Sequence, residues 1–226
     1  MFWGVNVAHS RPLVIGLTGS IAMGKSETAQ MFRRLRIPVF DADAEVHRLI
    51  GKGGPAVTEV GAAFPSAMRG EVIDRQALGE HIFANSSGLQ VLEGILHPLV
   101  ANARSRFLQR AGASRASVVV VDVPLLFETG GEHRCDAVVV VSAPGFLQRQ
   151  RAMARPNMSE GKLDAIKAQQ IPDRIKRRRA DFVISTGTGK RAVLLAIRKI
   201  LQTIVAGTRR RRFPRSRRRS LARSRS

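Results

Sequence analysis

Cysteine is nearly absent from this sequence of 226 residues, which contains only Cys135. A single thiol cannot form an internal disulfide, and this fits a reducing compartment. No apolar run approaches the roughly 20 residues that a membrane-spanning helix requires. Residues 1–12 lack the basic region, apolar stretch and small-residue cleavage site of a secretory signal. We therefore expect a cytoplasmic chain with no membrane segment.

Acidic residues are also scarce, with 17 Asp and Glu against 38 Lys and Arg and a formal net charge of +21. Residues 209–226 contain ten arginines and no acid, which leaves +11 for the rest of the chain. We place the start of this low-complexity Arg/Ser tail at residue 207 and expect residues 207–226 to be disordered. A solvated tail is the commoner explanation, but Arg/Ser runs also bind the phosphate backbone of nucleic acids.

Five short apolar segments are predicted to be β-strands: residues 13–17, 38–40, 117–121, 136–142 and 181–184. Two of them are continuous β-branched runs, which are typical of parallel strands buried on both faces. Helical patterns between the strands predict a three-layer α/β fold with a five-stranded parallel sheet. One domain at residues 13–206 is expected to follow an irregular leader at 1–12.

The stretch at about 44–112 is rich in helical patterns, with Gly/Pro breaks near 51–55 and 65–70. Because it lies between two predicted strands, it is interpreted as a helical insertion. Its clearest feature is an apolar stripe at helical spacing, which is predicted to pack in a core: Leu89, Leu92, Ile95, Leu96, Leu99 and Val100.

The strongest motif is G-x-x-x-x-G-K-[ST], which residues 19–26 match at every specified position. It follows an apolar strand and opens an amphipathic helix, as a loop that binds phosphates through backbone N–H groups requires. In such a loop Lys25 reaches the β- and γ-phosphates of ATP, and the Ser26 hydroxyl is a Mg²⁺ ligand. Nucleotide contacts are predicted at Gly19, Ala22, Met23, Gly24, Lys25, Ser26 and Glu27.

The motif alone does not distinguish kinases from other P-loop proteins. No N-K-x-D sequence for guanine recognition is present, which disfavours a GTPase. Motors and helicases usually need a longer chain. A small-molecule kinase with a short core and a mobile lid is therefore favoured.

Several further segments resemble the dephospho-CoA kinase family, in the family's order over about residues 13–206. They are residues 15–26, 39–43, 96–100 and 122–130, then Gln148 with Arg151 and Arg155, and finally 170–172 and 180–184. The resemblance implies transfer of the γ-phosphoryl group of ATP to the 3′-hydroxyl of dephospho-CoA, which yields CoA and ADP, with Mg²⁺ bound. It also implies a P-loop core, a helical substrate-binding insertion and a lid at about 145–172, and we expect a monomer.

Asp41 follows a predicted strand, at the sheet edge where ligands collect in open α/β folds. A carboxylate there can accept the proton of the attacking ribose hydroxyl, and the resemblance implies this catalytic role for Asp41. The alternative is a helix N-cap, because a helix follows at once. Asp43 and His47 are candidate substrate contacts, with an N-cap and a partly buried structural histidine as the respective alternatives.

Asp122 ends an apolar strand, where a carboxylate can hold Mg²⁺ through water. The resemblance implies substrate contacts from Pro124, Leu125 and Glu128 in the next loop and from His97 in the helical insertion. The alternative for the apolar residues of the loop is packing on the core. The alternative for His97 is a helix kink at the proline that follows it.

Arg151 and Arg155 are four residues apart, a spacing that places two side chains on one helix face. Two guanidinium groups on one face can bind the charge that develops on the transferred γ-phosphoryl group. The resemblance to the family's lid favours this catalytic role for both arginines.

Two residues of the phosphate loop depart from the family pattern, which usually has glycine at the position of Ala22 and threonine at that of Glu27. If position 22 needs a positive φ, alanine there costs about 1 kcal/mol or more. The Glu27 carboxylate either points away along its helix or weakens ATP binding. Three alternatives therefore stay open: another nucleoside or nucleotide kinase, a nucleic-acid-binding P-loop protein that uses the basic tail, and a family relative with little activity.

Overall fold

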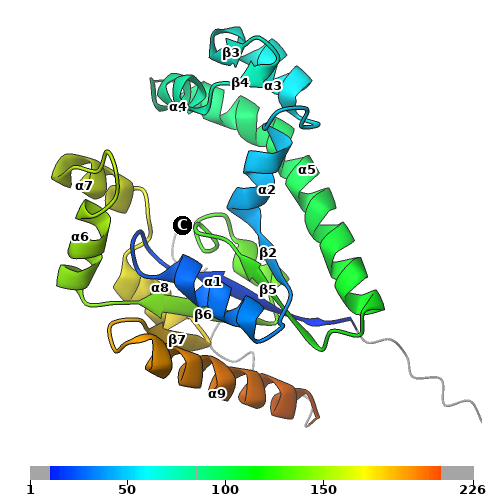
Figure 1. The fold of residues 1–226 in the computed structure, drawn as a ribbon, viewed down its shortest axis with the longest axis vertical. Helices are drawn as coiled ribbons and strands as arrows, with labels where there is room; N and C mark the ends of the chain where they lie inside the picture. The colour runs from blue at the N-terminus through cyan, green and yellow to red at the C-terminus, as the bar shows by residue number, and fades with distance from the viewer. Residues whose placement is uncertain (1–10, 85, 210–226) are drawn as a thin grey trace, which may run out of the picture. The chain divides into compact units, whose positions relative to one another are not determined.

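The computed structural model describes residues 11–84 and 86–209, which form two compact units (Figure 1). The sheet unit combines the described parts of residues 1–39 and 115–226. The helical unit consists of residues 40–114 and covers the stretch where the insertion was predicted. Each unit has its own cluster of buried apolar side chains.

A five-stranded sheet organises the sheet unit, in the order β2 (Val39–Asp41), β5 (Val118–Asp122), β1 (Leu13–Thr18), β6 (Ala137–Ser142) and β7 (Phe182–Ser185). Ile15 of the central strand lies opposite Val120 on one side and Ala137 on the other, and β1, β5, β6 and β7 pair in parallel. The predicted α/β fold with a five-stranded parallel sheet is confirmed.

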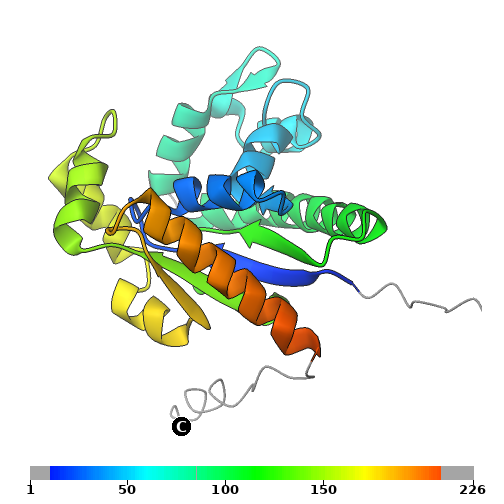
Figure 2. The ribbon, with the colours of Figure 1, turned by 60° about the horizontal axis from the view of Figure 1, so that its bottom comes forward.

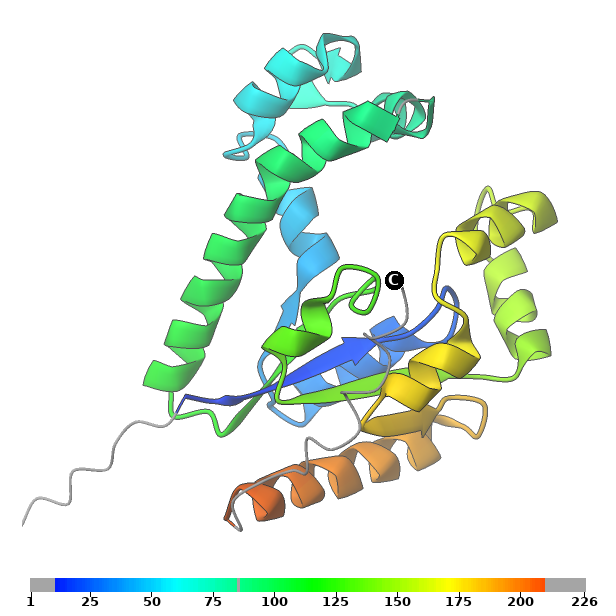
Figure 3. The same cartoon turned by 180° about the vertical axis from the view of Figure 1, so that it is seen from behind.

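Alternate residues of β6 serve the two faces of the sheet. Val139 and Val141 pack in the core that holds apolar side chains of α1 (Lys25–Arg34) and α9 (Lys190–Arg209). Figure 2 shows these two helices, in blue and orange. Val138 and Val140 pack with Leu126, Phe127 and other apolar side chains on the opposite face, where α8 (Asp173–Arg179) lies (Figure 3). Both faces are covered, which explains why the strand is a continuous valine run.

Two helix ends differ from the prediction. The helix expected to reach residue 155 is α6 (Gly145–Met153), and it ends two residues earlier because the residue before Pro156 is disfavoured in the helical region. α9 runs to Arg209, past the predicted start of the tail at 207. The single Gly207 costs a helix only about 1 kcal/mol, which is not enough to end it. The rest of the tail, 210–226, and leader residues 1–10 lie outside the described residues.

The helical unit contains α2 (Ala42–Leu49), α3 (Val57–Ala63), a 3-10 turn (Pro65–Ala67), α4 (Arg75–Ala84) and α5 (Ser86–Ala113). It also contains a short hairpin, β3 (Met68–Arg69) and β4 (Val72–Ile73), which the sequence pattern did not predict. Five of the six predicted stripe residues of α5 pack on this unit's core. Leu89 is 44% exposed, so its predicted burial is wrong.

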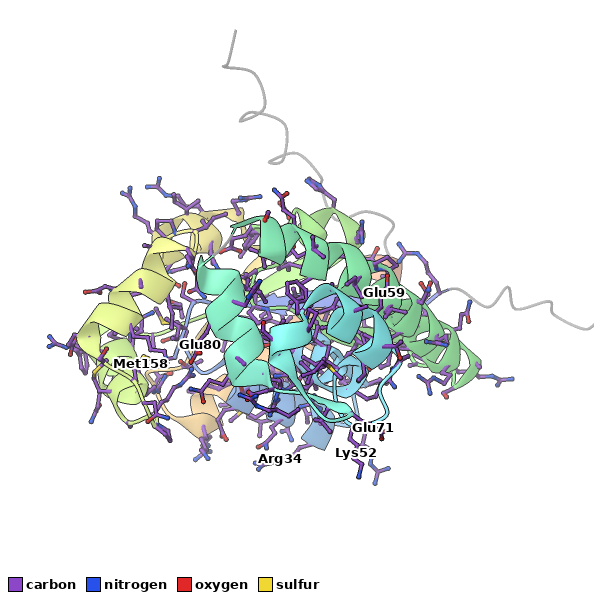
Figure 4. The ribbon with its side chains drawn as sticks, turned by 90° about the horizontal axis from the view of Figure 1, so that it is seen from above. Arg34, Lys52, Glu59, Glu71, Glu80 and Met158 are labelled. Carbon is purple, nitrogen blue, oxygen red and sulfur yellow. The ribbon has the colours of Figure 1, made fainter. Side chains whose placement is uncertain are left out.

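Four charged residues of the helical unit that are exposed to solvent, Lys52, Glu59, Glu71 and Glu80, are labelled in Figure 4. Asp74 precedes α4 and accepts hydrogen bonds from the backbone N–H groups of Gln76 and Ala77 at 2.9 and 3.2 Å. Both hydrogen bonds lower the pKa of the Asp74 carboxyl, and the bond from Ala77 has the larger effect. Among the described helices, none combines the length and apolar character of a membrane span.

Candidate active site

The phosphate loop joins β1 to α1 and needs glycine at both of its ends. A Cβ on Gly19 would lie 2.4 Å from Val141 Cγ2, inside the core of the sheet. Gly24 has a φ of 88° and caps α1 from the left-handed region, where side chains are strained. Glycine is therefore required both where the loop leaves β1 and where it enters α1.

The start of α1 provides the positive end of a helix dipole. The first-turn N–H groups of Lys25, Ser26 and Glu27 precede any carbonyl acceptor within their own helix. Such groups together form a favourable site for phosphate oxygens. The loop and this helix end are therefore suited to the polyphosphate of a nucleotide.

Lys25, the first residue of α1, and Asp122, the last residue of β5, meet at the carboxyl edge of the sheet. Lys25 Nζ lies 2.6 Å from Asp122 Oδ1, and the two side chains are only 15% and 3% exposed. The sequence predicted each residue as functional but not their direct contact. A cation and a carboxylate held this closely form the charged centre of the site.

The residues at this centre fit a magnesium ion that is shared with phosphate oxygens. Ser26 is exposed and follows Lys25 in the first turn of α1, and Asp122 is buried at the end of β5, so the chain offers one hydroxyl and one acidic group. Within residues 11–84 and 86–209, no three His, Cys, Asp or Glu side chains gather into a metal site of their own. Mg²⁺ commonly binds through one or two protein groups, water and substrate phosphates, so this donor set is sufficient.

The two unusual loop residues prove to have separate surroundings. Ala22 has a φ of 58°, so the positive φ suspected for this position is present. Its methyl is 6% exposed and belongs to an apolar cluster with Ala152 and Leu163. Glu27 Oε2 lies 3.1 Å from Lys190 Nζ at an exposed position, so this carboxylate points away from the loop.

Replacing Ala22 by Gly is expected to change the free energy of unfolding by less than about 1 kcal/mol. Glycine removes about 1–2 kcal/mol of strain from the left-handed backbone. Against this, the folded protein loses a buried methyl group worth about 0.8 kcal/mol. The greater entropy of the unfolded chain lowers stability further, by about 0.4–1 kcal/mol. Urea unfolding of both proteins measures the difference. A change above about 2 kcal/mol in either direction would show that one of these terms dominates.

Arg151 and Arg155 do not share a helix face, because α6 ends before Arg155. That prediction was wrong. Arg151 donates from Nη1 to Thr186 Oγ1 at 3.0 Å and from Nη2 to the Thr186 carbonyl at 2.9 Å. Thr186 Oγ1 donates to the Met23 carbonyl at 2.7 Å, so Arg151 is connected to the phosphate loop through one side chain. Arg155 is exposed in the turn after the helix.

The loop after β5 divides its predicted contacts between surface and core. Leu125 is 40% exposed and Pro124 is half-buried, whereas the next two apolar residues are buried. Glu128 Oε1 accepts from the Ile171 N–H at 2.8 Å and lies 2.8 Å from Nζ of the fully buried Lys176. Sequence reasoning missed Lys176, because a single lysine carries no local signal of such a contact.

The remaining predicted site residues belong to the helical unit. Asp41 accepts a hydrogen bond from the Ala44 N–H at 3.0 Å and is the N-cap of α2. Its position at the end of β2 is unchanged by this bond, which uses one carboxylate oxygen. Asp43 and His47 are exposed, and so is His97 on α5. The alternative of a partly buried His47 is therefore wrong.

A charge-neutral pair lies on α2, close in sequence to these residues. Arg48 donates to both carboxylate oxygens of Glu45, at 3.0 and 2.6 Å. These hydrogen bonds are the main cause that lowers the pKa of Glu45, with Arg106 and Arg110 contributing. The carboxylate is thus compensated within the helical unit, which limits its repulsion of an anionic ligand.

The parallel sheet, the glycine-bounded phosphate loop after β1 and the carboxylate at the end of β5 define a P-loop kinase fold with an acidic and a basic group at its centre. A family model described as Dephospho-CoA kinase matches residues 13–191. The chain belongs to the dephospho-CoA kinase family.

Individual relatives agree with this assignment. The chain is 53% identical over 199 residues to a dephospho-CoA kinase of Rhodospirillum rubrum, a match covering 88% of this chain and 94% of the relative. It is 50% identical over 199 residues to one of Rhodopseudomonas palustris, covering 88% and 99%. Among solved structures, TT1252 of Thermus thermophilus has a TM-score of 0.79 at 33% identity, covering 87% of this chain and 99% of that one. A dephospho-CoA kinase of Campylobacter jejuni has a TM-score of 0.63 at 27% identity, covering 86% and 98%.

Proposed function

We propose that the enzyme transfers the γ-phosphoryl group of ATP to the ribose 3′-hydroxyl of dephospho-CoA, which yields CoA and ADP in the last step of coenzyme A biosynthesis. The observation that carries this proposal is the family match over residues 13–191, combined with an intact Lys25–Asp122 centre. The departures at Ala22 and Glu27 leave that centre in place. We also propose that the enzyme acts as a cytoplasmic monomer, where ATP is available.

The chain's own residues account for phosphate binding and for activation of the acceptor. Backbone N–H groups at the start of α1 and the Lys25 ammonium bind the phosphates and stabilise the charge that develops on the transferred group. Asp41 accepts or orients the proton of the attacking hydroxyl. The Ser26 hydroxyl, and Asp122 through water, would hold Mg²⁺, which would supply further neutralisation of the phosphate charge.

The remaining predicted residues are proposed to orient the substrates. Arg151 is linked to Met23 through Thr186, so it can bring positive charge to the nucleotide side of the loop. The exposed Arg155 is a second donor in the lid. Substrate contacts are proposed from Asp43, His47, His97, Pro124 and Leu125. Glu128 is a further candidate, although it already pairs with Lys176.

Asp41→Asn separates the proposed proton acceptor from the helix cap. Asparagine caps a helix about as well as aspartate, so stability should hardly change. Loss of the base should lower kcat by about 10²- to 10⁴-fold. CoA formation from ATP, Mg²⁺ and dephospho-CoA, followed by mass, measures the rate, and calorimetric binding of ADP checks the nucleotide site.

Adenosine and AMP as acceptors distinguish the alternative kinases. Phosphorylation of either one, without CoA formation by the wild type, would contradict the proposed substrate. Asp41→Asn with more than about one tenth of the wild-type kcat would contradict the catalytic role of Asp41 alone.

A further inference from the structure

The middle of the phosphate loop is held from two sides by glutamine side chains of the lid. Gln148 of α6 donates from Nε2 to the Ile21 carbonyl at 2.9 Å. The Ile21 N–H donates to Gln170 Oε1 at 3.0 Å. Gln148 is only 7% exposed, and Gln170 follows α7 (Glu160–Ala168) at the other end of the lid. Both ends of the lid thus contact the same loop residue.

Apolar packing reinforces this double hydrogen bond. Ile21 and Ala22 pack in one cluster with four lid residues: Ala152, Met153, Met158 and Leu163. Ala152 is fully buried and Leu163 is 3% exposed. All of these residues belong to the sheet unit. The contact between loop and lid is therefore a packed part of one unit.

The two hydrogen bonds determine how successive peptide groups of the loop are oriented. A trans peptide points its C=O and its N–H in opposite directions. Because Gln148 binds the Ile21 carbonyl, the N–H of Ala22 in the same peptide is directed away from Gln148. Because Gln170 binds the Ile21 N–H, the preceding peptide is oriented as well. The loop must present a defined set of N–H groups to bind phosphates.

We propose that Gln148 and Gln170 are positioning residues, which hold the phosphate loop in its nucleotide-binding conformation and couple that conformation to the lid. The proposal rests on the proposed function only in requiring that the loop binds a nucleotide. The two glutamines have opposite chemical roles: the backbone carbonyl requires a donor from Gln148, and the backbone N–H requires an acceptor from Gln170.

This asymmetry provides a matched pair of variants, Gln148→Glu and Gln170→Glu. Both retain the size of the side chain and add one negative charge beside the same residue. A carboxylate at 170 still accepts the Ile21 N–H, whereas a carboxylate at 148 cannot donate to the Ile21 carbonyl. An effect of charge alone would be similar in the two variants, and an effect of loop positioning would not.

ADP binding by calorimetry is the primary measurement. We expect Gln148→Glu to raise the Kd for ADP at least about tenfold more than Gln170→Glu, because a buried carbonyl loses its partner. The KM for ATP should rise in parallel, while kcat at saturating ATP stays within about threefold of the wild type. Lowering the pH should reduce the defect of Gln148→Glu, since a protonated carboxyl regains an O–H donor.

Gln148→Met provides a second, uncharged variant if the first does not fold. It removes the donor at similar length, and the Kd for ADP should rise about tenfold. Equal defects in the two glutamate variants, or an unchanged ADP affinity in folded Gln148→Met, would overturn the proposal. Wild type that binds ADP but forms no CoA would refute the proposed function while leaving this comparison valid.

Discussion

Lys25→Met should lower the rate of CoA formation by at least about 10²- to 10³-fold, the usual cost of losing one group that stabilises transition-state charge. The lysine lies at the start of α1 with its ammonium 2.6 Å from Asp122 Oδ1. Methionine retains much of the apolar stem but cannot neutralise charge on the γ-phosphoryl group. Steady-state assays with saturating dephospho-CoA measure the effect on kcat and on the KM for ATP.

Lys25→Arg is the matched control, because it retains the positive charge next to Asp122 but not the compact ammonium. It should fold as the wild type does and still lose most of the activity, since a planar guanidinium does not reproduce the contacts of an ammonium between two phosphates. Retention of more than about one tenth of the wild-type rate by Lys25→Met would show that Lys25 does not stabilise the transition state.

Lys176→Met is expected to lower the free energy of unfolding by about 3 kcal/mol, at the lower end of the range for breaking a buried ion pair. Lys176 is fully buried, and its Nζ lies 2.8 Å from Glu128 Oε1. Removing the lysine leaves a carboxylate that is only 15% exposed without its counter-charge. The Ile171 N–H still donates to it, which limits the loss. Urea unfolding at neutral pH measures the difference.

Two further variants test this explanation. Combining Lys176→Met with Glu128→Gln should restore at least about half of the lost stability, because no lone charge remains buried. Arg149→Met breaks a surface ion pair, since the Arg149 and Glu160 side chains are 67% and 50% exposed. It should lower the free energy of unfolding by at most about 1 kcal/mol. A Lys176→Met protein within about 1 kcal/mol of the wild type would mean that the buried pair contributes nothing net.

Local patterns were sufficient for those parts of the site that depend on neighbours in the sequence. The phosphate loop was predictable because Gly19, Gly24, Lys25 and Ser26 act within eight consecutive residues. Asp122 was predictable because it ends a buried strand. The helix end at Met153 could also have been predicted, since Arg155 is followed by a proline that disfavours the helical region before it.

By itself, the sequence determined where the five strands of the main sheet lie along the chain, the phosphate loop and the family, because these depend on periodicity and on short motifs. Only the tertiary structure decided that Lys25 meets Asp122, that Glu128 pairs with Lys176, and that Gln148 and Gln170 bind the backbone of Ile21. These contacts join residues far apart in the chain, and their partners are selected by the register of the sheet and by the packing of helices on it. A side chain's type shows which bonds it can form, but its surroundings decide which of them it makes.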